Sequence, residues 1–147
     1  MSIICACAAV AQWASLYEPI AKANGLDARV VATVIWVESR GKADVISEAG
    51  AVGLMGVVPY RDLVEDILVP AVNIRIGAQR LAMNVSRGGS VRRGLIAYHI
   101  GVDGATRLGW ERSIDGQVFL LAFVDGWDAC WPGQPLPWAM PAREPEE

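Results

Sequence analysis

The spacing of apolar residues is the feature that most constrains the fold of this chain. Apolar side chains recur three and four positions apart through most of the sequence, and no alternating run of strand length stands out. A period near 3.6 residues places such side chains along one face of a helix, whereas a half-buried strand needs a period of two. We therefore predict a mainly α protein.

Capping and breaking residues set the expected ends of the helices. Asp27 and Ser90 are good N-cap residues, Pro70 suits a first helical turn, and glycines mark several stops. We predict five helices: from about Ile3 or Ala11 to Asn24, from just after Asp27 until Ser39-Arg40-Gly41 ends it, from Pro70 until Gly88-Gly89 stops it, from the Ser90 cap to just before Gly101, and from about Val118 to Trp127.

The segment from Gly41 to Pro59 carries no helical pattern and holds four glycines. We predict an ordered loop or a short β-hairpin there, and loops of this length are often functional. The Pro- and Glu-rich stretch from about 132 to 147 is expected to be irregular. No internal repeat or linker divides the sequence, so we expect one domain over residues 1–147.

Charge composition excludes several classes of partner. The chain has 147 residues and a formal net charge of −3, from 13 Lys plus Arg and 16 Asp plus Glu. A protein that binds nucleic acid or an anionic membrane needs a basic surface, which this composition does not supply. A chain of this length also folds without a metal or cofactor. We expect no nucleic-acid partner, no metal, no cofactor and a monomer.

The uncharged N-terminal stretch, residues 1–17, raises the question of a membrane segment or an export signal. Its strictly apolar part, Ile3 to Ala11, is much shorter than the roughly 20 residues of a spanning helix. The stretch lacks the basic start of a signal peptide, although Ala9-Val10-Ala11 is similar to a cleavage site. We expect no membrane span and the buried first turns of a helix, with an export signal as the alternative.

The three cysteines, Cys5, Cys7 and Cys130, are an odd number, without a CxxC motif or histidines at metal-ligand spacing. This pattern implies neither a disulfide framework nor a zinc site. We expect the cysteines to be buried as small hydrophobic residues.

Glu38 is the strongest candidate for a chemical role. It lies seven, four and three positions after Val31, Val34 and Ile35, so it shares their apolar stripe on the second predicted helix. Burial disfavours the charged carboxylate, which would raise the pKa of Glu38 and suit it to act as a general acid. The alternative is that Glu38, in the last helical turn, points to solvent or pairs with Arg40.

Three motifs follow one another downstream of this residue. The first is Glu38-Ser39, Ser47, Gly50-Ala51-Val52-Gly53-Leu54-Met55 and Pro59; the second is Pro70-Ala71-Val72-Asn73-Ile74 with Gly77 and Leu81; the third is Ala97-Tyr98-His99 with Gly101. In order and spacing they closely resemble the soluble lytic transglycosylase (SLT) domain family, related to goose-type lysozyme. The resemblance covers about residues 17–104, and three separated motifs are far more specific than one.

The resemblance implies a lysozyme-like fold and an activity on peptidoglycan glycan strands. Glu38 corresponds to the family's catalytic acid, which protonates the glycosidic oxygen between N-acetylmuramic acid and N-acetylglucosamine. As a carboxylate it then helps to deprotonate the C6 hydroxyl of the muramyl residue, and a 1,6-anhydro ring closes. No second carboxylate is needed, unlike in most glycosidases. The substrate-binding positions that the resemblance implies are Ser47, Gly56, Val58, Ala97, Tyr98 and His99.

Individual positions depart from the family pattern. Gly56 replaces the usual Gln after Gly-Leu-Met, and Val58 replaces a common Met, so one sugar-binding amide is missing. His99 replaces an Asn and could donate to a sugar acetamide in its place. Tyr98 corresponds to a tyrosine whose hydroxyl lies close to the catalytic glutamate, where a donor would help to position the carboxyl group.

Two alternatives stay open. One is a goose-type muramidase that activates water through a second carboxylate such as Asp103 or Asp44. The other is a non-catalytic peptidoglycan-binding or structural component of a phage or secretion apparatus. In each case the place of action would be the periplasm or cell wall, for instance for a phage lysis or virion protein, with the export route left open.

Overall fold

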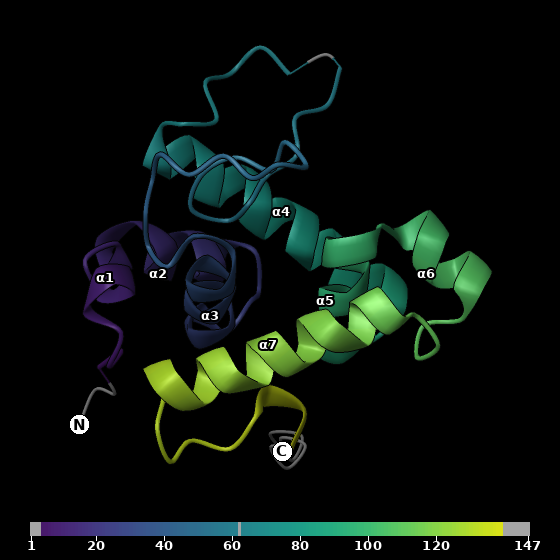
Figure 1. Ribbon diagram of the computed structural model, residues 1–147. Helices are drawn as coiled ribbons and strands as arrows, with labels where there is room; N and C mark the ends of the chain where they lie inside the picture. Colours follow the sequence, from purple (N-terminus) through teal and green to yellow (C-terminus); the bar gives the residue numbers. More distant parts are fainter. Residues whose placement is uncertain (1–3, 62, 140–147) are drawn as a thin grey trace, which may run out of the picture.

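The computed structural model describes residues 4–61 and 63–139 and consists mainly of helices (Figure 1). In chain order these are α1 (Ala8–Ala11), α2 (Ala14–Ala23), α3 (Ala28–Ser39), α4 (Pro70–Gly88), α5 (Val91–Ile100), α6 (Val102–Leu108), α7 (Ile114–Cys130) and the 3-10 turn η1 (Pro137–Ala139). No strand forms within the described ranges. The predicted mainly α fold class is therefore confirmed.

Helix α3 lies at the centre of the packing and contacts α1, α2 and α7 (Figure 1). Its first turn is capped as predicted, because the Asp27 side chain accepts a hydrogen bond from the Arg29 N–H at 2.9 Å. Its apolar stripe, which includes Val31, Val34 and Ile35, is fully buried. Helix α3 ends at Ser39, and the next residue, Arg40, caps it with a left-handed backbone (φ 55°). The chain then enters the loop that connects α3 to α4.

Helices α4 and α5 begin and end close to the residues that the sequence predicts. α4 starts at Pro70, and Gly89 ends it in the left-handed conformation. Ser90 then caps α5 by accepting a hydrogen bond from the Arg93 N–H at 3.1 Å. The two helices pack against each other, and α4 also packs on α2.

The single N-terminal helix that we predicted is two helices in the structure, α1 and α2. The break falls at Gln12 and Trp13, where the Trp13 indole N–H donates to the Gly41 carbonyl oxygen at 2.9 Å. This long-range bond holds the chain at the interruption. Val10 in α1 is fully buried, as expected for this stretch, and the proposed start at Ile3 lies outside the described residues.

The C-terminal third differs from the prediction at both of its helices. α6 was not predicted, and α7 extends beyond the expected 118–127 at both ends. Ser113 caps α7 by accepting a hydrogen bond from the Gly116 N–H at 3.0 Å, which explains the earlier start. After Trp131 the described chain is irregular except for η1, as predicted, and residues 140–147 lie outside the described part.

The long loop between α3 and α4 runs over α4 in Figure 1, and the segment predicted to be an ordered loop, residues 41–59, is described throughout. In place of a regular hairpin it has two isolated antiparallel bridges, from Val52 to Ile46 and from Val52 to Val57. Val52 and Val57 exchange backbone hydrogen bonds of 2.9 Å in both directions. Leu54 and Met55, between these residues, are fully buried, so the loop is anchored in the core.

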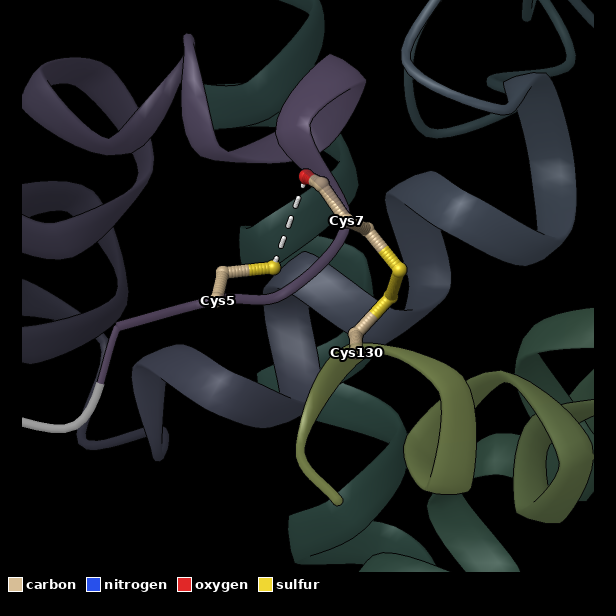
Figure 2. Close-up of side chains that lie close together, drawn as sticks. All are labelled: Cys5, Cys7 and Cys130. Atoms are coloured by element: carbon tan, nitrogen blue, oxygen red, sulfur yellow. Dashed lines mark hydrogen bonds between the residues drawn. A yellow bond between two sulfur atoms is a disulfide. The ribbon is translucent and has the colours of Figure 1, made fainter.

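The cysteines are buried as expected, but Cys7 and Cys130 form a disulfide bond that we did not predict (Figure 2). The two residues are 123 positions apart, and local sequence carries no signal for such a pairing. The fold brings them together, because the Ala6 N–H donates to the Cys130 carbonyl oxygen at 2.8 Å. Cys5 keeps a free thiol, which donates a 3.7 Å hydrogen bond to the Cys7 carbonyl oxygen.

No helix in the described part of the chain combines the length and the apolar character that crossing a membrane requires.

Candidate active site

Glu38 lies in the last turn of α3, with its side chain partly buried. Desolvation by this burial raises the pKa of the Glu38 carboxyl group from 4.5 to about 7. No side chain or backbone group in residues 4–61 and 63–139 makes a hydrogen bond or ion pair with this carboxyl group, so the alternative pairing with Arg40 does not form. A carboxyl group with such a pKa holds its proton about half of the time at neutral pH, as a general acid requires.

Glu38 lines a pocket of about 290 Å³, whose other walls come from the long loop and the end of α5. The residues that line it are Glu38, Ser47, Ala49, Ala51, Gly56, Val58, Tyr98 and His99. Five of the six predicted substrate-binding positions are thus brought together with Glu38 in one cavity. Among the lining residues, Glu38 carries the one carboxylate.

The sixth position, Ala97, lies elsewhere. Its side chain is buried, and the residue lines a neighbouring pocket of about 420 Å³ together with Tyr98. Ala97 is part of the core and does not line the Glu38 pocket.

Gly56 lies directly against the catalytic candidate. Its backbone is left-handed (φ 61°), and a Cβ added there would overlap the Glu38 carboxyl group. From the resemblance of the motifs we expected only the loss of a sugar-binding amide at this position. The structure shows that glycine also leaves the space that the Glu38 carboxyl group occupies.

Tyr98 lines the same pocket, but its hydroxyl does not donate to Glu38. The hydroxyl donates a 2.5 Å hydrogen bond to the Met55 carbonyl oxygen and so ties α5 to the loop. Burial raises the pKa of Tyr98, the negative charge of Glu38 raises it further, and the nearby Arg80 guanidinium lowers it. Tyr98 is thus a neutral hydroxyl close to Glu38 that retains lone pairs for a further hydrogen bond.

Ser47 and His99 have identifiable structural contacts in addition to their place in the pocket. The Ser47 hydroxyl accepts a 3.0 Å hydrogen bond from the Ala51 N–H within the loop. The exposed His99 ring stacks on Phe119 of α7, with 4.8 Å between ring centroids. Both side chains are therefore held in fixed positions at the pocket wall.

Sequence reasoning missed two buried polar residues that organise the loop. The Ser39 hydroxyl donates to the carbonyl oxygens of Ile35 and Leu54, at 2.9 and 2.8 Å, and so links the end of α3 to the loop. The Asn73 amide donates to Val52 and Ile67 and accepts from the Met55 N–H. Both residues belong to the recognised motifs, and their place in those motifs was the available signal.

Within the described residues, the one cluster of side chains that could hold a metal ion consists of Cys5, Cys7 and Cys130. Two of the three sulfur atoms are used in the disulfide. This group lies apart from the Glu38 pocket, and none of its members lines that pocket.

A family model matches the part of the chain that contains this pocket. The Transglycosylase SLT domain matches residues 15–109, which is more than half of the chain and contains every residue of the Glu38 pocket. The chain belongs to the SLT domain family. The match extends slightly beyond the resemblance recognised from the motifs.

Two known proteins are similar to this SLT-family chain. A transglycosylase of Enterobacteria phage PRD1 is 36% identical over 110 residues, which cover 73% of this chain and 42% of the phage protein. The structure of an inactive mutant of the lytic transglycosylase Slt from Pseudomonas aeruginosa is similar, with a TM-score of 0.57 and 26% identity over 74% of this chain and 20% of that chain. The chain thus spans less than half of either relative, and the match confirms the expected lysozyme-like fold.

Proposed function

We propose that this SLT-family chain is a peptidoglycan lytic transglycosylase. It would cleave the β-1,4 bond between N-acetylmuramic acid and N-acetylglucosamine and leave 1,6-anhydromuramyl ends. The single observation that carries this proposal is the environment of Glu38, a partly buried acid with a pKa near 7 and no other carboxylate lining its pocket. The similarity to a phage transglycosylase and to Slt supports it.

In this mechanism Glu38 serves in turn as acid and as base. Its proton moves to the glycosidic oxygen as the bond from that oxygen to C1 of the muramyl residue breaks. The resulting carboxylate then accepts the proton of the C6 hydroxyl while the C6 oxygen bonds to C1, so Glu38 ends in its starting state. Burial suits both steps, since it raises the pKa of the acid and strengthens the carboxylate as a base.

The remaining pocket residues would bind the sugars. Ser47 and His99 present polar atoms at the wall, and Gly56 and Val58 provide its backbone and apolar surface. Tyr98 would hold Met55 in place and offer a hydroxyl near the reacting groups. Ala97 would contribute to the neighbouring pocket.

Replacement of Glu38 tests the proposal. Glu38→Gln keeps the shape of the side chain but cannot supply the proton, so it should fold normally and release no muropeptides from purified sacculi. Glu48→Gln is the matched control, because Glu48 is exposed in the same loop and does not line the pocket. Mass spectrometry of the products should show 1,6-anhydromuramyl ends, and residual cleavage by Glu38→Gln at the wild-type rate would rule out this acid.

The second candidate is a muramidase, which would release reducing ends. Asp103 favours this candidate, because it lines the pocket next to that of Glu38 and shares Tyr98 with it. Loss of activity in Asp103→Asn together with reducing ends in the products would support hydrolysis. Binding to sacculi without any released fragment would instead support a non-catalytic component of a phage or secretion apparatus.

The place of action that fits these functions is the periplasm or cell wall. The Cys7–Cys130 disulfide supports this location, since such bonds persist mainly in oxidising compartments outside the cytosol. We further propose that residues 1–147 act as a single monomeric domain and reach the wall as a phage lysis or virion protein or with a secretion system. Analytical ultracentrifugation tests the monomer.

A further inference from the structure

The Glu38 pocket continues into a longer groove along α4. A second pocket of about 300 Å³ shares Gly56, Val58, Tyr98 and His99 with the Glu38 pocket. A third, of about 420 Å³, shares Arg80, Asn84 and Tyr98 with the second. Because consecutive pockets share walls, they form one depression that runs from the end of α3, past Tyr98, to the turn between α5 and α6.

Arg80 of α4 lies where these pockets meet, and its side chain is held in place. Its guanidinium donates a 2.7 Å hydrogen bond to the Val58 carbonyl oxygen and stacks over the Tyr60 ring at 5.1 Å from the centroid. It is near enough to the Tyr98 hydroxyl to lower the pKa of that group. Arg80 therefore presents a positioned positive charge close to Tyr98, which also lines the Glu38 pocket.

Arg87 adds a second positive charge farther along the same groove. Residues 80, 84 and 87 are four and three positions apart and so share one face of α4, and all three line the third pocket. The two arginines are seven positions apart, which corresponds to about 10 Å along the helix axis. Neither arginine forms an ion pair in the described part of the chain.

Arginines that line a groove and have no ion-pair partner among the described residues favour an anionic ligand, whereas the sugar rings of the glycan are neutral. In peptidoglycan the negative charges next to the glycan are carboxylates. They belong to the stem peptide that hangs from the lactyl group of the muramyl residue, or to the lactyl group itself where the peptide has been removed. The two arginines extend away from Glu38, as a ligand with carboxylates spread along a chain would require.

We propose that Arg80 and Arg87 bind the carboxylates of the stem peptide, so that this protein prefers peptide-bearing glycan strands to strands without peptides. The exposed Asp103 of α6 also lines the third pocket, and its carboxylate suits the free amine of a diamino acid in the same peptide. This inference rests on the proposed action on peptidoglycan and names the part of the substrate that the groove beyond Glu38 recognises.

Binding measurements test this preference without relying on cleavage. Glu38→Gln protein is titrated with soluble glycan strands that carry stem peptides and with the same strands after an amidase has removed the peptides and left free lactyl carboxylates. Arg87→Gln in this background should weaken binding to peptide-bearing strands about fivefold, as for the loss of one surface ion pair. Binding to stripped strands should change less than about twofold, and high salt should reduce the difference.

Two further variants distinguish charge recognition in the groove from a general loss of positive charge. Arg87→Lys keeps the charge and should retain most of the affinity for peptide-bearing strands. Arg112→Gln removes an exposed arginine that lines none of the three groove pockets and should bind like the parent. Equal weakening by Arg87→Gln and Arg112→Gln, or equal weakening on both kinds of strand, would overturn the proposal, the latter pointing to the lactyl carboxylate. Failure of wild-type protein to cleave either strand would count against the proposed function alone.

Discussion

The backbone of Gly56 lies so close to the Glu38 carboxyl group that a Cβ atom at residue 56 would overlap it. The two residues come from different segments, the last turn of α3 and the long loop. Glycine at position 56 thus sets where the acid can lie in its pocket.

Gly56→Ala should therefore impair catalysis more than folding. The new methyl group has to displace the Glu38 carboxyl group, and we expect a loss of at least about tenfold in kcat/KM on sacculi. Gly89→Ala is the matched control, because Gly89 is also left-handed (φ 83°) but a Cβ there has no neighbour within 4 Å. Both variants should lose about 1 kcal/mol of stability from backbone strain. Equal activity of the two would show that the contact with Glu38 is unimportant.

The pH dependence of cleavage should report the protonation of Glu38. The acid must carry its proton to start the reaction, and its pKa is about 7. Therefore kcat/KM should fall as the pH rises through about 7, by roughly tenfold for each further pH unit. Initial rates of sacculus solubilisation between pH 5 and 9 measure this profile. A rate that stays constant up to pH 9 would contradict the assignment of Glu38 as the acid.

The raised pKa of Glu38 also predicts how stability depends on pH. The folded protein holds this proton up to about pH 7, whereas in the unfolded chain it dissociates near 4.5. The free energy of unfolding therefore falls as the pH rises from 4.5 to 7, and the loss above pH 7 is roughly 3 kcal/mol.

Glu38→Gln removes this titration, so it should raise the melting temperature more at pH 8 than at pH 4. Calorimetry at both pH values measures the difference, with the exposed Glu48→Gln as the control. A gain in melting temperature that is the same at pH 4 and pH 8 would show that the Glu38 carboxyl group is not desolvated in the folded state.

The three cysteines predict an exchange of disulfide partners. The sulfur atoms of Cys5, Cys7 and Cys130 all lie within 4.8 Å of one another (Figure 2). In Cys7→Ser, Cys5 should therefore take over and form a bond with Cys130 in a glutathione redox buffer. This variant should keep most of the stabilisation of the native disulfide, which is about 5 kcal/mol from the loop entropy of so long a loop.

Disulfide mapping by mass spectrometry without reduction, combined with melting curves, tests this exchange. Cys130→Ser is the control, because it removes the common partner and should lose the full stabilisation. If Cys7→Ser instead retains two free thiols in a buffer that fully oxidises the wild-type protein, Cys5 cannot reach Cys130.

Features that depend on neighbouring residues could be predicted from the sequence. Asp27, Pro70 and Ser90 fix helix starts through caps and backbone angles that act within one turn. The stripe of Val31, Val34 and Ile35 predicted that Glu38 would be desolvated, because helical periodicity alone places a residue on a face. The partial burial of Glu38 and the mainly α fold were therefore accessible without the structure.

Features that depend on contacts between distant segments were decided by the tertiary structure alone. The overlap of residue 56 with Glu38, the Cys7–Cys130 bond and the interruption at Trp13 each join parts of the chain whose separation in sequence carries no distance information. The same holds for Arg80 and Arg87, because only the tertiary structure shows that they line the groove between α4 and the end of α5. Local propensity selects the elements, and packing brings their side chains within reach of one another.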